Sequence, residues 1–389
     1  MIVLVVFLRM FGWGFVDPFY SLFLKTFTDN YTFLGVLGAT HSFVSLLTII
    51  PLVRLTDKVR DAKIMMDGEV MYLFAILFYM LAGFSQSLVL LFCAFVLNGI
   101  AYPLIIVGAE TYIRRHSPEK YTARSFGYYT ALLYFGWILA MLLSVFLVPY
   151  YSFNTMFLFV IPSIVLSFYI LPKIHERGFK SIFRGFRKYF HAKEDFTCIF
   201  SNLKTLNPRM YFFLLVSFFD GVIISFLYLF MPLFGSSLGL EFREIPFLLS
   251  VMYMPFIFSF FFSEAADRMK KMNVIATGLF IGAVSFILLS FIVAQLWVVV
   301  LASMVSFSIA ILRPAYNGMI TRLTPRVMLG EMTGVNNFSM RLGHVVGPIF
   351  MGFIADLYGI QITFFAIAIL AFFLGGVALI FRHSPYFCD

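Results

Sequence analysis

The chain has 389 residues, of which 61% are hydrophobic and only 12% are charged, and its mean hydropathy of +0.95 lies far outside the range of soluble globular proteins. Composition therefore predicts an integral membrane protein. The formal net charge of +9 is concentrated in polar connections, so we expect it to reflect membrane topology and contact with anionic lipid headgroups, not an acidic substrate or a nucleic acid. The 3 cysteines show neither a disulfide framework nor metal-ligand spacing, and no cofactor or metal is predicted.

Twelve apolar runs are long enough to cross a membrane as helices, since a span needs about 20 mostly apolar residues. Six of them precede a long polar segment, at residues 1–25, 33–53, 66–84, 88–113, 125–149 and 153–172. Six follow it, at residues 210–234, 244–264, 273–292, 294–320, 332–355 and 360–381. The sequence therefore predicts an all-α integral membrane fold with twelve transmembrane helices in two pseudo-symmetric halves. We expect six-helix bundles at residues 1–172 and 210–389, the second with a short tail, joined by a linker at residues 173–209.

The predicted linker is strongly basic, with nine lysines and arginines against three acidic residues. Basic loops beside apolar spans lie on the cytoplasmic side of a membrane. The shorter loops alternate in charge in the same sense, so we expect a multi-pass protein of the inner or plasma membrane with both termini cytoplasmic. Phenylalanines at helical spacing in the linker indicate either a short helix in the headgroup layer or a solvated connection.

Several residues of the first half recur in the second half at a constant displacement. Four of them lie 207 residues before their counterparts (325 minus 118): Arg115, Pro118, Gly127 and Gly136 correspond to Arg322, Pro325, Gly334 and Gly343. The loops at residues 55–63 and 265–271 also match, at a displacement of 210 (267 minus 57). Apolar composition alone would not place acids, prolines and glycines in register, so the pattern indicates a duplicated unit.

At these residues the chain resembles the major facilitator superfamily over its whole length. The two matched loops resemble the family motif G-x-L-x-D-R-x-G-R-R between helices 2 and 3, although Val53 and Ser263 replace its first glycine. The segment 330–334, followed by Gly343 and Gly347, resembles the glycine-rich start of helix 11. Helix 5 lacks the G-P-x-x-G-G element of proton-driven drug antiporters. The resemblance implies a secondary transporter in which helices 1, 4, 7 and 10 line a central cavity and helices 3, 6, 9 and 12 face lipid.

The distribution of ionisable residues agrees with that arrangement. Predicted helices 6, 9 and 12 contain no carboxylate, lysine, arginine or histidine, and helix 3 has only Asp67 and Glu69 near its cytoplasmic start. Charged groups inside a membrane are costly and are therefore candidates for function. The candidates are Arg9 and Asp17 in helix 1, Glu110 in helix 4, Asp220 in helix 7, Arg313 in helix 10, and Arg341 and His344 in helix 11.

Asp17 is the predicted proton carrier. It precedes Pro18 and follows two glycines, so we expect a local break in its helix that frees backbone carbonyls to line a site. The alternative is that Asp17 only accepts hydrogen bonds from a neighbouring helix and never titrates. Glu110 is a second candidate for proton binding, or it is held in an ion pair with Arg114 one turn later.

Arg9 and Asp220 occupy similar depths in the repeat-related helices 1 and 7, which suggests that they pair across the two halves in one transport state. Arg313 and Arg341 either bind an anionic group of the substrate or stabilise the fold by pairing with Glu110 or Asp220. His344 shares a helix face with Arg341, either as part of that site or as a hydrogen-bonded packing residue.

The two matched loops are predicted to act in conformational gating. Asp57 with Lys58, and Asp267 with Arg268, lie at cytoplasmic helix ends, where such pairs form in one state and break in another. The glycines spaced by four in segments 330–334 and 343–347 are expected to permit close helix packing.

Together these features predict a monomeric secondary active transporter that moves a small organic solute by alternating access, with proton coupling. An uncoupled facilitator or an exporter of lipophilic compounds is the alternative. The sequence has no Walker nucleotide-binding motif, no zinc-protease motif and no nucleophile elbow, so neither an ATP-driven pump nor an intramembrane enzyme is predicted. A scaffold or receptor would not need the buried charges.

Overall fold

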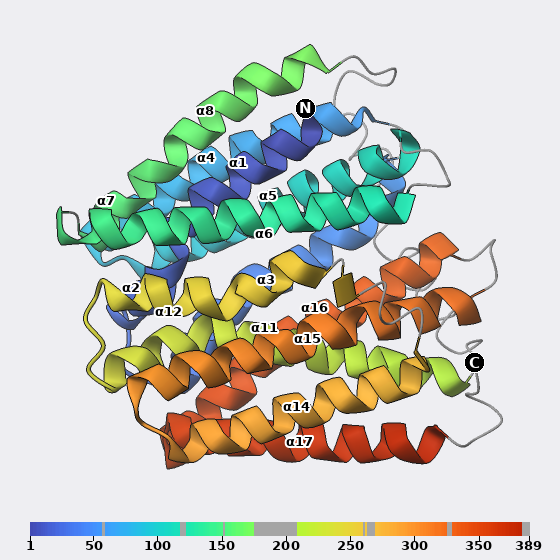
Figure 1. Cartoon of the computed structure of the whole chain (residues 1–389). Coiled ribbons are helices and arrows are strands. Elements are labelled where there is room, and N and C mark those ends of the chain that lie inside the picture. The colour runs from blue at the N-terminus through green and yellow to red at the C-terminus, as the bar shows by residue number, and fades with distance from the viewer. Residues whose placement is uncertain are drawn as a thin grey trace. The chain divides into compact units, whose positions relative to one another are not determined.

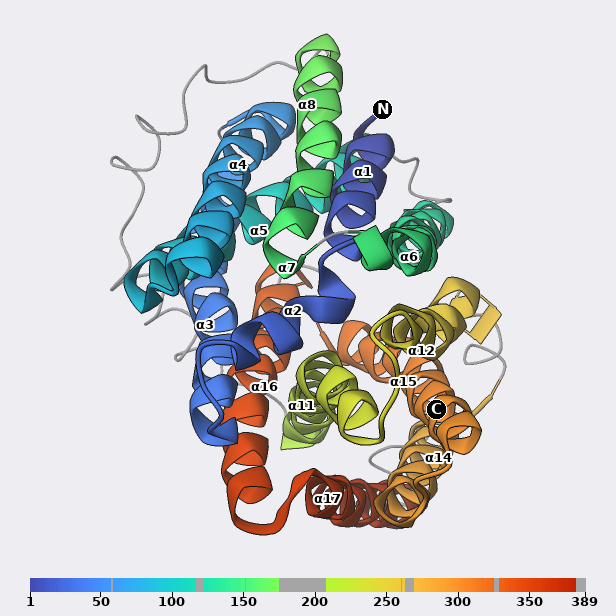
Figure 2. The same ribbon diagram turned by 90° about the vertical axis from the view of Figure 1, so that its left-hand side faces the viewer.

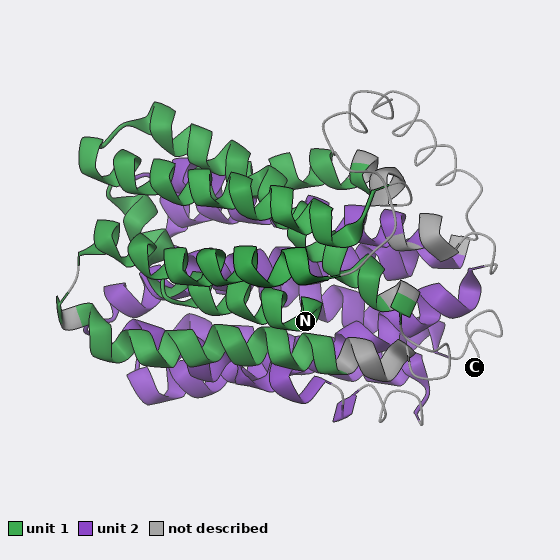
Figure 3. Cartoon of the chain, turned by 90° about the horizontal axis from the view of Figure 1, so that it is seen from above, with its two compact units in different colours: residues 1–27, 37–200 green, residues 28–36, 201–389 purple. Residues whose placement is uncertain are grey.

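The computed structural model describes residues 1–56, 59–116, 122–150, 152–174, 208–259, 261–262, 269–324 and 329–382. These residues form α-helices and short 3₁₀ helices, with no β-strand among them (Figure 1). The chain divides into two compact units, residues 1–27 with 37–200 and residues 28–36 with 201–389 (Figure 3). The predicted linker helix and the predicted gating residues Asp57, Lys58, Asp267 and Arg268 lie outside the described residues.

The helices of the first half correspond to six predicted spans. They are α1 (Ile2–Gly14), α2 (Asp17–Lys25), α3 (Tyr31–Thr56), α4 (Asp61–Ser85), α5 (Leu88–His116), α6 (Thr122–Leu147), α7 (Phe153–Met156) and α8 (Val160–Ile170). Short 3₁₀ segments follow α6, α7 and α8, so the sixth predicted span is assembled from several pieces. It remains one apolar span over Phe153–Lys173.

The described helices of the second half lie at the other six predicted spans. They are α11 (Pro208–Ser237), α12 (Glu244–Tyr253), α14 (Lys271–Phe291), α15 (Gln295–Leu323), α16 (Leu329–Tyr358) and α17 (Ile360–Phe381). Helix α12 continues as a 3₁₀ helix over Met254–Phe258, because Pro255 lacks the backbone donor that would extend the α-helix. Ten described helices are long and apolar enough to cross a membrane, and the bent α1–α2 pair makes eleven if it is counted as one broken span. The shorter helix α12 lies where the predicted span 244–264 begins.

The predicted break in the first span is confirmed. Helix α1 ends at Gly14, α2 begins at Asp17, and their axes bend by 42°. Pro18 lies in the first turn of α2, where its missing N–H removes no helical hydrogen bond. The sequence therefore determines both the break and the place of Asp17 at the first position of the new helix.

Glycines bring helices of the same unit into backbone contact. A Cβ atom at Gly14 would lie 2.5 Å from the Trp137 carbonyl oxygen of α6, and one at Gly136 would lie 2.9 Å from the Phe7 carbonyl oxygen of α1. In the second unit, Gly343 of α16 lies directly against the Phe218 carbonyl of α11. Gly136 and Gly343 are repeat partners, so the duplicated pattern has a counterpart in the helix pairs α1–α6 and α11–α16, each of which is labelled in Figure 2.

Gly347 also fits the predicted packing role, because a Cβ there would lie 3.0 Å from the Cα of Val222. Gly334 does not, since a Cβ at this position would meet no described atom within 4 Å. The predicted packing role of Gly334 therefore has no support among the described residues and stays a prediction.

The beginning of α3 belongs to the second unit. Asp356, near the end of α16, accepts backbone hydrogen bonds from Tyr31 through Oδ1 and from Thr32 through Oδ2, both at 2.7 Å. Asn30 accepts a further bond from the Phe33 amide at 2.7 Å. These contacts satisfy N–H groups that have no partner within the first turn of a helix.

Candidate functional site

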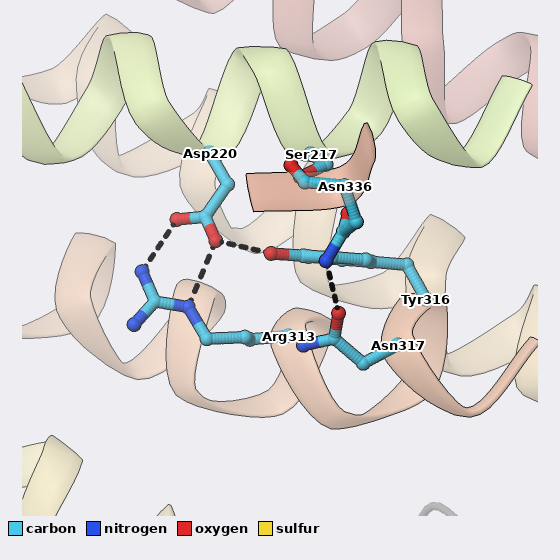
Figure 4. Close-up of polar contacts among 6 residues, drawn as sticks. All are labelled: Ser217, Asp220, Arg313, Tyr316, Asn317 and Asn336. Carbon is cyan, nitrogen blue, oxygen red and sulfur yellow. Dashed lines mark hydrogen bonds and ion pairs between the residues drawn. The ribbon is translucent and has the colours of Figure 1, made fainter. Parts of the chain in front are cut away.

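The second unit buries an ion pair between α11 and α15 (Figure 4). Asp220 of α11 is 0% exposed. Arg313 of α15 donates from Nε to Asp220 Oδ2 at 2.8 Å and from Nη2 to Oδ1 at 2.9 Å. Tyr316, one turn after Arg313, donates its hydroxyl to Oδ2 at 2.7 Å. The carboxylate therefore receives three hydrogen bonds, two of them in the bidentate geometry that suits arginine.

The pairing of Arg313 with Asp220 is one of the two arrangements considered for Arg313, and its role in binding a substrate stays a prediction. The guanidinium is committed to Asp220 in this structure, while the Arg313 side chain retains 29% exposure. Asp220 also has its partners inside its own unit. The hypothesis that Asp220 pairs with Arg9 in another transport state stays a prediction.

An amide cluster continues the polar site along α15 and α16. Asn336 donates from Nδ2 to the side-chain oxygen of Asn317 at 2.9 Å, and the Ser217 hydroxyl lies 3.4 Å from the Asn336 carbonyl oxygen (Figure 4). Asn317 lies 207 residues after Glu110 (317 minus 110) and is therefore its repeat partner. Tyr316 and Ser217 were missed, although each lies three residues from a recognised charge and therefore on the same helix face.

The first unit holds a second polar network around Arg9 of α1. Arg9 is 4% exposed, and its Nη2 donates to Asn98 Oδ1 of α5 at 3.1 Å. Its guanidinium carbon lies over the Tyr72 ring of α4, a cation–π arrangement. Asn98 in turn donates to the Tyr79 hydroxyl at 3.4 Å, and Tyr79 also hydrogen-bonds to Tyr20 of α2. Four helices therefore converge on one buried cation.

Asp17 lies beside this network and is 0% exposed. Its Oδ1 accepts a hydrogen bond from Trp13 Nε1 at 3.2 Å, across the break between α1 and α2. As the first residue of α2 it also lies at the positive end of that helix dipole, which favours a negative charge. The predicted role in proton transfer stays a prediction.

Glu69 of α4 was not a predicted site residue, because it was placed near the cytoplasmic start of a lipid-facing helix. Its side chain is in fact completely buried, at 0% exposure, and it lies within electrostatic range of Arg9. Asp67, two residues earlier, pairs with Lys63 at 2.7 Å. The recurrence of Glu69, Tyr72 and Tyr79 on one face of α4 was a signal that could have identified it.

The remaining predicted residues with described side chains lie on α5 and α16. Glu110 is half-buried on α5 and interacts electrostatically with Tyr129 of α6. The side chain of Arg114, its predicted partner, lies outside the described residues. Arg341 and His344 lie three residues apart on α16, and the His344 ring packs close to Gly221 of α11. No group of residues able to hold a metal ion occurs in the described part of the chain.

Comparison with known proteins agrees with this architecture. The family profile described as Major Facilitator Superfamily matches residues 2–344 and, in a second match, residues 213–387. An uncharacterized MFS-type transporter of Methanocaldococcus jannaschii is 29% identical over 100 residues, which make up 26% of this chain and 26% of that relative.

Two solved structures share the fold at low sequence identity. A mutant of the nucleoside transporter NupG gives a TM-score of 0.77 at 14% identity, covering 97% of this chain and 98% of that chain. A bacterial homolog of the human lysosomal transporter Spinster, in an inward-facing and unoccupied conformation, gives 0.72 at 14% identity, covering 99% and 97%. The protein therefore belongs to the major facilitator superfamily and is a multi-pass membrane transporter rather than an enzyme.

Proposed function

We propose that this chain is a secondary active transporter that moves a small organic solute by alternating access and couples its movement to protons. The observation that carries the proposal is the complete burial of three carboxyl side chains in membrane-spanning helices: Asp17, Glu69 and Asp220 are each 0% exposed. Such groups destabilise a membrane protein unless they are paired, hydrated or protonated. A carboxyl group that changes its protonation between states can link proton movement to the conformational cycle.

The two halves support different parts of this proposal. In the second unit Asp220 is held by Arg313 and Tyr316, so its negative charge is compensated. In the first unit Asp17 and Glu69 lie beside a network with a single arginine, Arg9. We therefore place proton coupling in the first unit and assign the Asp220–Arg313 pair to substrate recognition or state-dependent rearrangement.

The substrate is proposed to be a small polar or anionic organic molecule. The side chain of Arg313 is 29% exposed and already binds the carboxylate of Asp220. A substrate carboxylate or phosphate could therefore compete with Asp220 for the same guanidinium N–H groups. Arg341 of α16 is the second candidate for an anionic group. The protein is proposed to act as a monomer. Both termini are proposed to lie on the cytoplasmic side, because basic loops beside apolar spans lie on that side of a membrane.

The test is proton flux in proteoliposomes loaded with a pH-sensitive dye. Organic acids, amines, sugars, nucleosides and lipophilic drugs are added in turn, with Asp17→Asn alongside the unsubstituted protein. One panel is expected to drive proton movement that empty liposomes lack. If a labelled solute equilibrates while no panel moves protons, the protein is an uncoupled facilitator and proton coupling is refuted.

A further inference from the structure

Glu69 differs from the other buried carboxyl groups described above in its hydrogen bonding. Within the described chain, neither Oε1 nor Oε2 of Glu69 has a hydrogen-bond partner. By contrast, Asp17 accepts a bond from Trp13, and Asp220 accepts bonds from Arg313 and Tyr316. An ionised carboxylate without hydrogen bonds is strongly disfavoured in a dry interior, whereas the neutral acid is much less so. The enclosed geometry therefore favours Glu69 with its proton bound.

The guanidinium of Arg9 lies over the ring of Tyr72, one turn after Glu69 on α4. Arg9 and Glu69 lie within electrostatic range of each other, yet no hydrogen bond or ion pair within 4.0 Å joins them in the described structure. Arg9 Nη2 is used by Asn98, and Nη1 is buried without a hydrogen-bond partner among the described residues. A vacant acceptor pair and a vacant donor therefore lie in the same interior. This is the arrangement expected when the carboxyl group is neutral and its ion pair has not formed.

The other groups near this pair are mostly phenols. They are Tyr72 and Tyr79 on α4, Tyr102 on α5 and Tyr20 on α2. A tyrosine hydroxyl is a far weaker acid than a carboxyl group, so these phenols do not compete with Glu69 for its proton. Asp17 on α2 and Glu110 on α5 are the other carboxyl groups on these neighbouring helices. Tyr169 of α8 is 65% exposed and therefore does not belong to the buried network. On α4 itself, Asp67 is paired with Lys63.

We propose that Glu69 is the proton-binding residue of the first unit and that Arg9 is its electrostatic partner. The inference rests on the proposed proton-coupled function and names the site of coupling. In the enclosed state Glu69 keeps its proton. When water reaches the site, the proton passes from the carboxyl oxygen to that water, and the carboxylate left behind is balanced by Arg9, whose Nη1 becomes its hydrogen-bond donor. Reprotonation from the other side of the membrane breaks that pair.

Infrared difference spectroscopy of the purified full-length protein in lipid nanodiscs tests the assignment without a substrate. A protonated carboxyl group gives a C=O stretching band that shifts in D₂O and disappears when the group ionises. We expect such a band in the unsubstituted protein and its loss in Glu69→Gln. Asp67→Asn is the matched control, because it makes the same chemical change on the same helix to a carboxylate already paired with Lys63. That variant is expected to retain the band.

Three results would overturn the proposal: no titrating carboxyl band in the unsubstituted protein, an unchanged band in Glu69→Gln, or loss of the band in Asp17→Asn alone. Glu69→Met, which has a similar volume and no polar atoms, serves as a second variant if the amide is not accommodated. Arg9→Met tests the partner, because removing the cation disfavours the carboxylate and the band should persist to a higher pH. If the band disappears at the same pH in Arg9→Met as in the unsubstituted protein, the pairing of Glu69 with Arg9 is refuted.

The flux assay separates this proposal from the proposed function. If a solute drives proton movement, Glu69→Gln is expected to abolish that movement while exchange of labelled solute across the membrane continues. If no solute drives proton movement but the infrared band belongs to Glu69, the proposed proton coupling is refuted, whereas the assignment of Glu69 as a buried, protonated residue is supported. If proton movement is intact in Glu69→Gln, the site assignment fails and coupling stands.

Discussion

Removing Arg313 should destabilise the second unit more than removing Asp220, although the two side chains form one pair. Arg313→Met leaves the Asp220 carboxylate fully buried with only the Tyr316 hydroxyl as donor. Asp220→Asn leaves a guanidinium whose side chain is 29% exposed and can reach water. The more deeply buried partner therefore determines the larger penalty.

The magnitude follows from the geometry. Two unit charges about 4 Å apart attract by about 4 kcal/mol at an effective dielectric constant of about 20. Breaking a buried pair by deleting one partner costs about 3–5 kcal/mol, so Arg313→Met is expected to lower the free energy of unfolding by that amount. The double variant Asp220→Asn with Arg313→Met leaves no unpaired charge in the site and should recover most of the loss.

The assay is reversible unfolding in mixed micelles of lipid-like detergent and sodium dodecyl sulfate, applied to the two single variants and the double variant as a thermodynamic cycle. The reasoning is refuted if Arg313→Met costs less than about 1 kcal/mol, the scale of an exposed salt bridge. It is also refuted if the double variant is no more stable than Arg313→Met.

Three further predictions concern single contacts. Tyr316→Phe removes one hydrogen bond to Asp220 and should cost about 0.6–1.7 kcal/mol in the same unfolding assay, whereas a loss as large as that of Arg313→Met would show that Tyr316 compensates the charge alone. Asp356→Ala removes the acceptor at the start of α3 and should cost about 1 kcal/mol, visible as faster hydrogen exchange of the Tyr31 amide; unchanged exchange would contradict the capping role. Gly343→Leu should reduce the yield of folded protein because its side chain meets the backbone of α11, while Gly334→Ala, which meets no described atom within 4 Å, should be tolerated; equal yields would contradict the packing argument.

Hydropathy, loop charge and internal repetition were sufficient to predict the fold. Each depends on a property that local sequence carries directly: the length of an apolar run, the sign of a connection, or the register of glycines and prolines. The break at Pro18 was predictable for the same reason, because proline lacks the donor that a continuous helix needs. The 3₁₀ segment around Pro255 follows the same rule but was not predicted.

The site was predictable only in part. The sequence places a residue along the length of its helix, but it does not show toward which neighbouring helix that side chain points. Asp220 and Arg313 were both identified, yet their pairing joins residues 93 positions apart and required the orientation of α11 relative to α15. Glu69 was missed because its helix was assigned to the lipid-facing set, whereas one face of α4 is enclosed and another exposes Phe74 and Leu81. The tyrosines on the enclosed face were the only local indication.

The backbone contact between α11 and α16 restricts how this transporter can move. Helices whose backbones approach closely at Gly343 and Gly347 cannot readily slide past each other. We therefore expect Asp220 on α11 and Asn336 on α16 to move together as one rigid body. We expect the same of α1 and α6, where Gly14 and Gly136 permit close backbone contact. Flexing within the first unit is then expected to concentrate at the 42° bend before Asp17, where conformational strain can accumulate during a transport cycle.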